Sequence, residues 1–269
     1  MTQPGPRHAD HDAIGAGIRD AYRRSDAAMQ YRVEQHPLGW FQHAPGGVAA
    51  GSVTVDDIDP ASVPDLRAEI ERQFGDEMRV TLFVDDRDRD QRLSGALVAA
   101  GFEPAEGSTF LAYTGQPPTI PSLRGVTIGE VDADGLERWA RVKLQGFANS
   151  EDEPDPEQFA QELAQRRAEQ QGSGRFLLAT ARSEDAAVIG LWGDEDWLIF
   201  NLATRLPYRR LRLGELLLSD IVDEAIGDPG CRSVLIDTDE TDWMVEWYRR
   251  FGFTDEVYWR RRYNLLEAD

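Results

Sequence analysis

The sequence predicts a mixed α/β fold of the α+β kind in two domains, and three observations support this. Short apolar runs of strand length alternate with amphipathic helical patterns along the 269 residues. A proline-rich stretch, Gln116-Pro-Pro-Thr-Ile-Pro, interrupts them near the middle. After it, the patterns run β-α-α-β-β-β-α-β-α-β, an order that implies one mixed sheet with helices on both faces. We therefore predict a first domain over 1–115, a linker over 116–122 and a second domain over 123–269.

The first half contains three helical and five strand-like patterns. The helices are predicted at 14–29, 64–74 and 91–100, where apolar residues recur at helical spacing. The strands are predicted at 31–34, 38–41, 47–55, 78–84 and 109–114.

The second half begins with a strand at 126–131 and helices at 134–147 and 156–171. A hairpin over 176–192 follows, and then a strand that starts at Leu198 and leads into a helix ending near Ala225. A strand at 233–237, a helix at 242–251 and a strand at 257–265 complete the chain.

Composition limits the functional classes. The net charge of -20 argues against a nucleic-acid or membrane-surface partner, because both partners are polyanions. No apolar run is long enough to cross a bilayer, and the first residues are not expected to act as a signal peptide because they lack an apolar segment. A single cysteine, Cys231, fits a reducing compartment, so a cytoplasmic protein is expected. The four histidines all lie in the first half and give no metal-site spacing, and the oligomeric state stays open.

The turn between the strand at Leu198 and the next helix is rich in arginine. Arg205, Arg209, Arg210 and Arg212 surround the point where the helix begins. The first amides of a helix have no intrahelical acceptor, and the helix dipole places positive charge there. This junction is therefore predicted to bind an anion.

Two motifs around this junction resemble those of the GCN5-related N-acetyltransferases. Arg209-Arg-Leu-Arg-Leu-Gly214 is similar to their phosphate-loop pattern Arg/Gln-x-x-Gly-x-Gly/Ala, with Arg212 in place of the first glycine. Tyr248-Arg-Arg-Phe-Gly-Phe253 is similar to the end of their downstream block, in which Thr241, Met244 and Trp247 replace the family's Asn, Ala and Leu. The order of elements in 120–269 also matches this family.

The resemblance implies an acetyl-CoA site. Backbone amides from Arg210 to Glu215 would hold the pyrophosphate, Leu202 N–H would polarise the thioester carbonyl, and Tyr248 would protonate the departing thiolate. The main chain can serve at Arg212 if its φ is negative. The implied cofactor-binding residues are Leu202, Ala203, Thr204, Arg209, Arg210, Arg212, Leu213, Gly214 and Glu215.

The general base is not apparent from the motifs. The stretch from Leu198 to Phe200 offers no carboxylate where many of these enzymes carry a glutamate. Asp237 and Asp239 end the next strand and are candidate catalytic bases, although strand-end caps are an equally good interpretation. The acidic loop at 151–155 would attract a cationic amine, or is simply a solvated loop.

The first half carries a weaker echo of the second. Leu97-Val-Ala-Ala-Gly-Phe, followed by the strand at Phe110, resembles the block that begins at Tyr248. The turn after Val55 is acidic and would repel phosphate. We therefore predict that 1–115 is a degenerate acetyltransferase-like domain without a cofactor site, the alternative being an unrelated α+β domain.

The resulting functional prediction is direct, acetyl-CoA-dependent acetylation of a small-molecule or peptide amine. An acyl-CoA-binding regulatory protein without turnover and another acyl transferase on the same scaffold are the alternatives.

Overall fold

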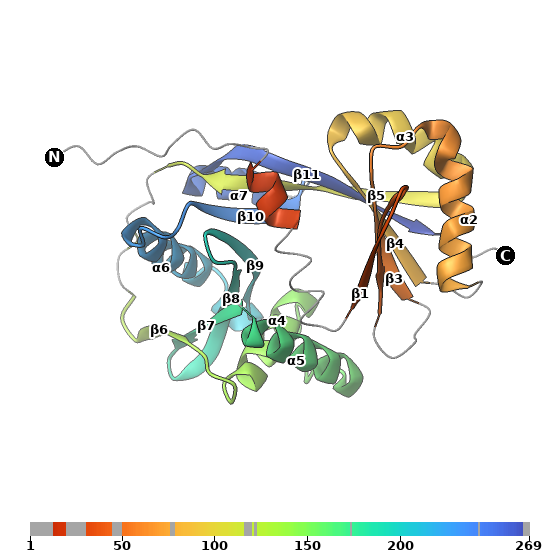
Figure 1. The fold of residues 1–269 in the computed structure, drawn as a ribbon. Coiled ribbons are helices and arrows are strands. Elements are labelled where there is room, and N and C mark those ends of the chain that lie inside the picture. Colours follow the sequence, from red (N-terminus) through yellow and green to blue (C-terminus); the bar gives the residue numbers. More distant parts are fainter. Residues whose placement is uncertain are drawn as a thin grey trace. The chain divides into compact units, whose positions relative to one another are not determined.

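The structure, a computed structural model, describes residues 13–19, 31–44, 50–75, 79–115, 120, 123–172, 174–241 and 243–265. Its strands follow the hydrogen-bonded order β1-β2-β3-β4-β11-β5-β10-β9-β8-β7-β6 (Figure 1). Parallel pairs (β3–β4 and β9–β10) and antiparallel pairs both occur in it. The predicted mixed α/β class is confirmed.

The chain forms two compact units, and each contains segments from both halves of the sequence. The C-terminal unit comprises Met1–Ala21, Leu111–Asp237 and Glu246–Asp255. The N-terminal unit comprises Tyr22–Phe110, Thr238–Val245 and Glu256–Asp269. Apart from Ile120, the predicted linker at 116–122 lies outside the described residues. The helix predicted at 14–29 is seen at 13–19, and its remaining positions are likewise outside them.

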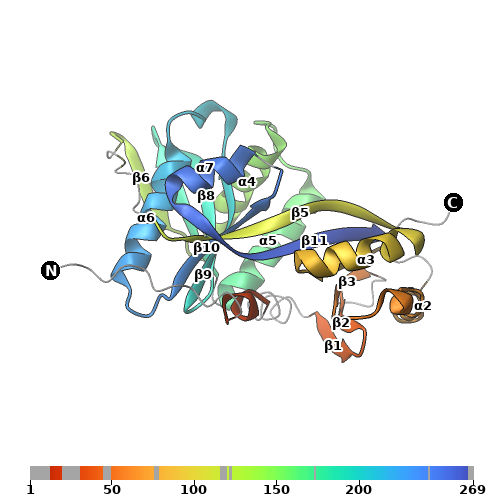
Figure 2. The same cartoon turned by 90° about the horizontal axis from the view of Figure 1, so that it is seen from above.

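The C-terminal unit packs helices on both faces of a sheet. Helices α4 and α5 cover one face of β7, β8 and β9, and α6 covers the other (Figure 2). Four elements have residues in both units: β5 (Phe102–Tyr113), β10, α7 and β11. The bounds are β6 Val126–Glu130, α4 Leu136–Ala148, α5 Pro156–Gln171, β7 Gly174–Ala181, β8 Glu184–Trp192, β9 Asp196–Thr204, α6 Leu213–Gly227, β10 Ser233–Asp239, α7 Trp243–Phe251 and β11 Phe253–Leu265.

Local sequence explains the helices under β9. Helix α4 turns Leu136, Trp139 and Val142 toward the sheet, and all three are almost fully buried. Helix α5 begins where Asp155 accepts hydrogen bonds from two first-turn amides and Pro156 supplies a preset φ. These local signals position α4 against the strand that carries the candidate site.

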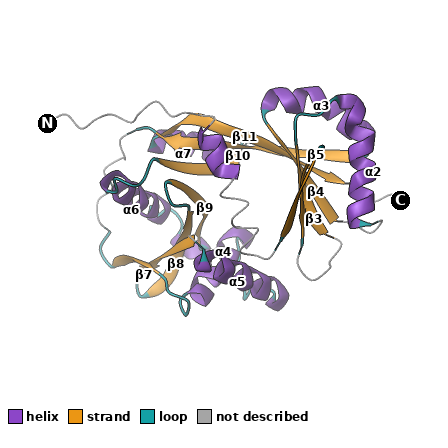
Figure 3. Ribbon diagram, in the orientation of Figure 1, coloured by secondary structure: helices purple, strands orange, loops and turns teal. Residues whose placement is uncertain are grey.

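The N-terminal unit places α2 and α3 on one face of its strands (Figure 3). Its core is formed by the apolar faces of both helices and by β2, β3 and β4. Within this unit β11 lies between β4 and β5, so the last strand of the chain is an interior strand. The bounds are β1 Arg32–His36, β2 Gly39–His43, β3 Ala50–Val55, η2 Pro60–Ser62, α2 Val63–Phe74, β4 Arg79–Asp85, α3 Arg87–Ala99 and β5 Phe102–Tyr113.

Strand β5 starts earlier than predicted. Its first residues include Glu103, Pro104 and Gly107, which are typical of a loop, so the sequence predicted a strand only from 109. A Cβ at Gly107 would lie 2.7 Å from Glu240 Oε1 and 2.8 Å from Trp259 Nε1. The glycine therefore permits a close approach within the N-terminal unit, and tertiary packing overrides the local preference.

Candidate active site

Strand β9 separates from its parallel neighbour halfway along its length. Pairing joins Asp196–Ile199 of β9 to Ser233–Ile236 of β10, and it ends there although β9 continues to Thr204. In the described chain, no later residue of β9 pairs with β10. The second half of β9 thus has one edge whose backbone groups are not used by the neighbouring parallel strand.

A bulge reshapes the same half of β9. Val188 pairs with Ala203 and Gly190 with Phe200, so β9 has one more residue than β8 across this interval. Asn201 in the bulge has a φ of 52°. Such a bulge changes the direction of the following amide, which belongs to Leu202. Sequence analysis did not predict the bulge, and the only signal for it is an asparagine, which tolerates positive φ, in an apolar strand.

The arginine-rich turn is a short 3-10 turn, η3 (Leu206–Tyr208), followed by Arg209–Arg212 and then α6. The first α6 backbone bond runs from Leu216 N to Arg212 O at 3.0 Å, so the amides of Leu213, Gly214 and Glu215 have no intrahelical acceptor. Arg212 is left-handed, with φ 62° and ψ 22°, and its side chain makes no cap. A left-handed residue followed by a helical one directs consecutive amides toward one point, which suits an anion.

Arg212 does not meet the condition of a negative φ that the sequence set for a non-glycine residue here, because its φ is 62°. Position 212 takes a left-handed conformation that glycine adopts readily, and arginine tolerates it at a cost of about 1–2 kcal/mol. The Arg212 guanidinium contacts Glu215 on the first turn of α6, with Nε 2.7 Å from Oε2. The backbone at position 212 is therefore left-handed, and the positive charge of the Arg212 side chain is paired with Glu215.

The four arginines of the turn have different partners. Arg205 pairs with Glu151, and Arg209 donates to two main-chain carbonyls, Thr204 O at 3.2 Å and Gly146 O at 2.8 Å. Arg210 is exposed, has a φ of 65°, and shows no side-chain partner in the described chain. The positive charge left for an anion thus comes from the α6 amides and Arg210, whereas the sequence pattern had suggested all four guanidinium groups.

We expect the variants Arg212→Gly and Arg212→Val to differ in their free energy of unfolding. Glycine removes the left-handed strain, whereas a β-branched valine has an even less favourable left-handed conformation. The free energy of unfolding should therefore be about 1–2 kcal/mol higher for Arg212→Gly than for Arg212→Val. Urea unfolding of the two variants measures this difference. Equal stabilities would show that position 212 is not left-handed.

Tyr248 lies on α7 with only 5% of its surface exposed. Its ring packs edge-on against Trp247 at 5.0 Å and against Phe253 at 6.2 Å. A Cβ at Gly214 would lie 3.7 Å from the Leu202 side chain and 3.9 Å from Trp247 Cη2. The first turn of α6, the bulge of β9 and the Trp247 face of α7 therefore meet, and Tyr248 is next to this point along the helix.

The two candidate bases, Asp237 and Asp239, differ in their solvent exposure and in the unit to which they belong. Asp237 is half-buried and is the first β10 residue beyond the last pair with β9. Asp239 is exposed and belongs to the N-terminal unit. Asp196, which was not a predicted base, lies at the start of β9 and accepts hydrogen bonds from Arg232 Nε at 2.9 Å and Ser233 Oγ at 2.6 Å. A base role for Asp237 or Asp239 stays a prediction.

The acidic loop at 151–155 is largely occupied by internal contacts. Glu151 pairs with Arg205, Asp152 with the Ser150 hydroxyl at 2.8 Å, and Asp155 caps α5. Glu153 lies 3.1 Å from Arg141 Nε. Each of these carboxylates therefore has a structural role.

Within the described ranges, no three His, Cys, Asp or Glu side chains are grouped to hold a metal ion. None of the described helices has the length and apolar character that a membrane span requires.

The C-terminal unit thus combines a mixed α/β sheet, a diverging parallel strand with a bulge, and a helix start whose first amides have no intrahelical acceptor. Residues 136–253 match the family model described as the Acetyltransferase (GNAT) family. The C-terminal half of the chain therefore carries a domain of the GCN5-related N-acetyltransferase family, as the motifs predicted.

Solved structures share the fold over nearly the whole chain. A GCN5-related N-acetyltransferase from Kribbella flavida has a TM-score of 0.68 at 17% identity, covering 97% of this chain and 98% of its own. One from Sphaerobacter thermophilus has a TM-score of 0.59 at 15% identity and covers both chains completely (100%). A tandem GNAT protein from the clavulanic acid biosynthesis pathway has a TM-score of 0.58 at 14% identity, covering 98% and 91%. No curated protein sequence matches this chain.

Proposed function

We propose that the protein is an acetyl-CoA-dependent N-acetyltransferase that transfers the acetyl group directly to a small-molecule or peptide amine. The observation that carries this proposal is that, within one unit, the half of β9 that does not pair with β10 meets the free amides at the start of α6. The free edge of β9 suits an extended arm that carries amide groups. The amides at the start of α6 suit a pyrophosphate. The match of residues 136–253 to the GNAT family supports the same assignment.

The proposed chemistry assigns a task to each group. The amides from Arg210 to Glu215 hold the pyrophosphate, and the main chain of Ala203 and Thr204 holds the pantetheine amides. Leu202 N–H donates to the thioester oxygen as the amine attacks and negative charge develops. The new C–N bond forms as the C–S bond breaks.

Two proton transfers complete the reaction. Tyr248 supplies a proton to the departing thiolate, and Asp237 or Asp239 accepts the proton of the amine directly or through water. The acceptor amine thereby becomes an amide and the thiolate becomes a thiol. The proton lost by the tyrosine and the proton gained by the aspartate balance each other.

We also propose that the N-terminal unit is an acetyltransferase-like unit without a cofactor site. Its β3 and β4 pair in parallel from Ala50 to the last residue of β3, Val55, so no gap opens between them. The carboxylate of Asp59 accepts a hydrogen bond from Ala61 N at 2.8 Å, which places a negative charge at the start of η2. Arg89 Nη1 donates to Val55 O at 3.1 Å and closes the strand end.

Calorimetric titration with acetyl-CoA is expected to show one binding site per chain. Ligand at a hundredfold excess over Kd should raise the free energy of unfolding by about 3 kcal/mol, measured as an increase in Tm. Two sites would show that the N-terminal unit also binds. No binding and no shift at millimolar acetyl-CoA would contradict the cofactor assignment.

Thiol release with a panel of amines then distinguishes the function classes. An N-acetyltransferase releases coenzyme A in proportion to amide formed. A regulatory acyl-CoA-binding protein binds without release, and a different acyl transferase responds to another acyl donor. From the single cysteine we also propose a cytoplasmic location. From the charge of -20 we propose that the partners do not include nucleic acid or membrane surfaces.

A further inference from the structure

We propose that Arg205 and Arg209 are positioning residues that fix the α4–α5 loop, residues 149–155, to the end of the acyl-donor strand β9. This inference rests on the proposed function, because it assigns β9 to the donor. Both arginines were expected to add positive charge at the anion site, but the guanidinium of Arg205 pairs with Glu151 and that of Arg209 donates to Gly146 O. They lie on either side of η3, so one short turn carries both attachments.

Arg209 satisfies the end of α4. The amides of Asn149 and Ser150 both donate to Gln145 O. The amide of Ser150, four residues after Gly146, is therefore not used by Gly146 O, which is left without this helical hydrogen bond. Arg209 Nη2 donates to that carbonyl at 2.8 Å, and its Nε donates to Thr204 O at 3.2 Å. One guanidinium therefore joins the negative end of α4 to the last residue of β9.

Gly146 makes this junction possible. A Cβ at position 146 would lie 2.9 Å from Ala203 Cβ and 3.3 Å from Thr204 N. The last turn of α4 thus packs directly on the two residues proposed to hold the pantetheine amides. Any displacement of this turn displaces the wall behind the donor strand.

Arg205 holds the loop that follows. Its Nε lies 3.0 Å from Glu151 Oε2, its Nη2 contacts the same oxygen, and its Nη1 donates to Asp185 O at 2.8 Å. Gln145 Nε2 donates to Glu151 O at 3.2 Å and to Asp152 O at 3.3 Å. The loop is therefore attached both to α4 and to the residue directly after β9.

The same attachment shapes a ligand-sized hollow. A hollow of about 520 Å³ is lined by residues of α4, the α4–α5 loop, the β7–β8 turn and Arg205. That volume is in the range of small-molecule sites. Because Arg205 contributes to its wall and Arg209 contacts β9, donor binding and the shape of this hollow are expected to be coupled.

Hydrogen–deuterium exchange of the full chain tests this inference with Arg205→Met and Arg209→Met. Methionine has a similar length but no donor groups. For the measurement without ligand, Arg210→Met is the matched control, because Arg210 is on the same turn and exposed. Without ligand, peptides spanning residues 146–155 should exchange about tenfold faster in the first two variants and at the wild-type rate in the control.

The coupling is tested by adding coenzyme A. We expect it to slow exchange of residues 146–155 in the wild type, and to have little effect there in Arg209→Met even when that variant is saturated. Wild-type exchange in both Arg205→Met and Arg209→Met would overturn the inference. If the wild type does not bind coenzyme A, the proposed function fails, while the measurement without ligand still decides whether the arginines hold the loop.

Discussion

Replacing Tyr248 by phenylalanine is expected to lower acetyl transfer by a factor of about 10²–10⁴ while the affinity for coenzyme A stays unchanged. The variant keeps the ring and its packing against Trp247 and Phe253, and removes only the hydroxyl proposed to protonate the thiolate. Thiol release at saturating amine measures turnover, and calorimetric titration measures affinity.

Tyr113 provides a matched control for this substitution. Its ring also packs edge-on against Phe253, at 5.3 Å, and it lies in the same unit. Burial, together with the charge of Asp223, raises the pKa of Tyr113 to about 12. In the described chain its buried hydroxyl has no hydrogen-bond partner, so Tyr113→Phe should lose neither turnover nor stability.

The two tyrosine variants together separate chemistry from packing. Unchanged turnover in Tyr248→Phe would refute the acid role. Equal losses in both variants would instead indicate that the environment of Phe253, rather than a proton donor, limits the reaction.

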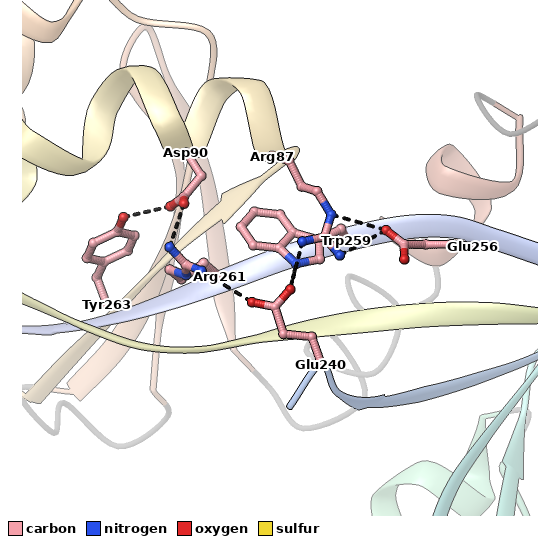
Figure 4. A network of polar contacts seen from close by, with 7 residues as sticks. All are labelled: Arg87, Asp90, Glu240, Glu256, Trp259, Arg261 and Tyr263. Atoms are coloured by element: carbon pink, nitrogen blue, oxygen red, sulfur yellow. Dashed lines mark hydrogen bonds and ion pairs between the residues drawn. The ribbon is translucent and has the colours of Figure 1, made fainter. Parts of the chain in front are cut away.

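A second large effect is expected at Tyr263, where Tyr263→Ala should lower the free energy of unfolding by about 3–5 kcal/mol. Tyr263 is completely buried (0% exposed) in the core of the N-terminal unit. Its hydroxyl donates to Asp90 Oδ1 at 2.6 Å (Figure 4). Alanine therefore leaves a cavity and removes one partner of a buried carboxylate.

Asp90 belongs to a network of polar contacts, so the loss of the Tyr263 hydroxyl would affect further residues. Asp90 also accepts from Arg261 Nη1 at 2.8 Å, and Arg261 reaches Glu240 at 3.3 Å. Glu240 accepts from Arg87 at 2.7 Å and from Trp259 Nε1 at 3.0 Å, and both arginines stack on the Trp259 ring (Figure 4). Burial opposes ionisation of Glu240, but the hydrogen bonds from Arg87 and Trp259 hold its pKa below the ordinary value.

Urea unfolding monitored by circular dichroism measures the effect. Tyr263→Phe is the control, since it keeps the ring and loses only the hydroxyl, and it should cost about 1–2 kcal/mol. An alanine variant as stable as the phenylalanine variant would show that the ring at position 263 does not contribute to the core of the N-terminal unit.

The sequence by itself determined the elements whose signals are local. Helix α5 was predicted at its observed bounds because Asp155, Pro156 and a helical apolar spacing all lie within one segment. The two family motifs identified the GNAT domain for the same reason, since each depends on residues close together in the chain. Expected roles for Asp237, Asp239 and Tyr248 stay predictions, because spacing does not show what each side chain faces.

Only the tertiary structure decided which partners those residues have. Arg209, in the turn before α6, contacts Gly146 of helix α4. Strand β5 continues through Gly107 because Glu240 and Trp259 fill the space beside it. The left-handed backbone at Arg212 likewise follows from the path between β9 and α6 rather than from the preference of arginine. Such features depend on long-range packing, whose free energy exceeds local conformational preferences, and a pattern along the chain does not contain it.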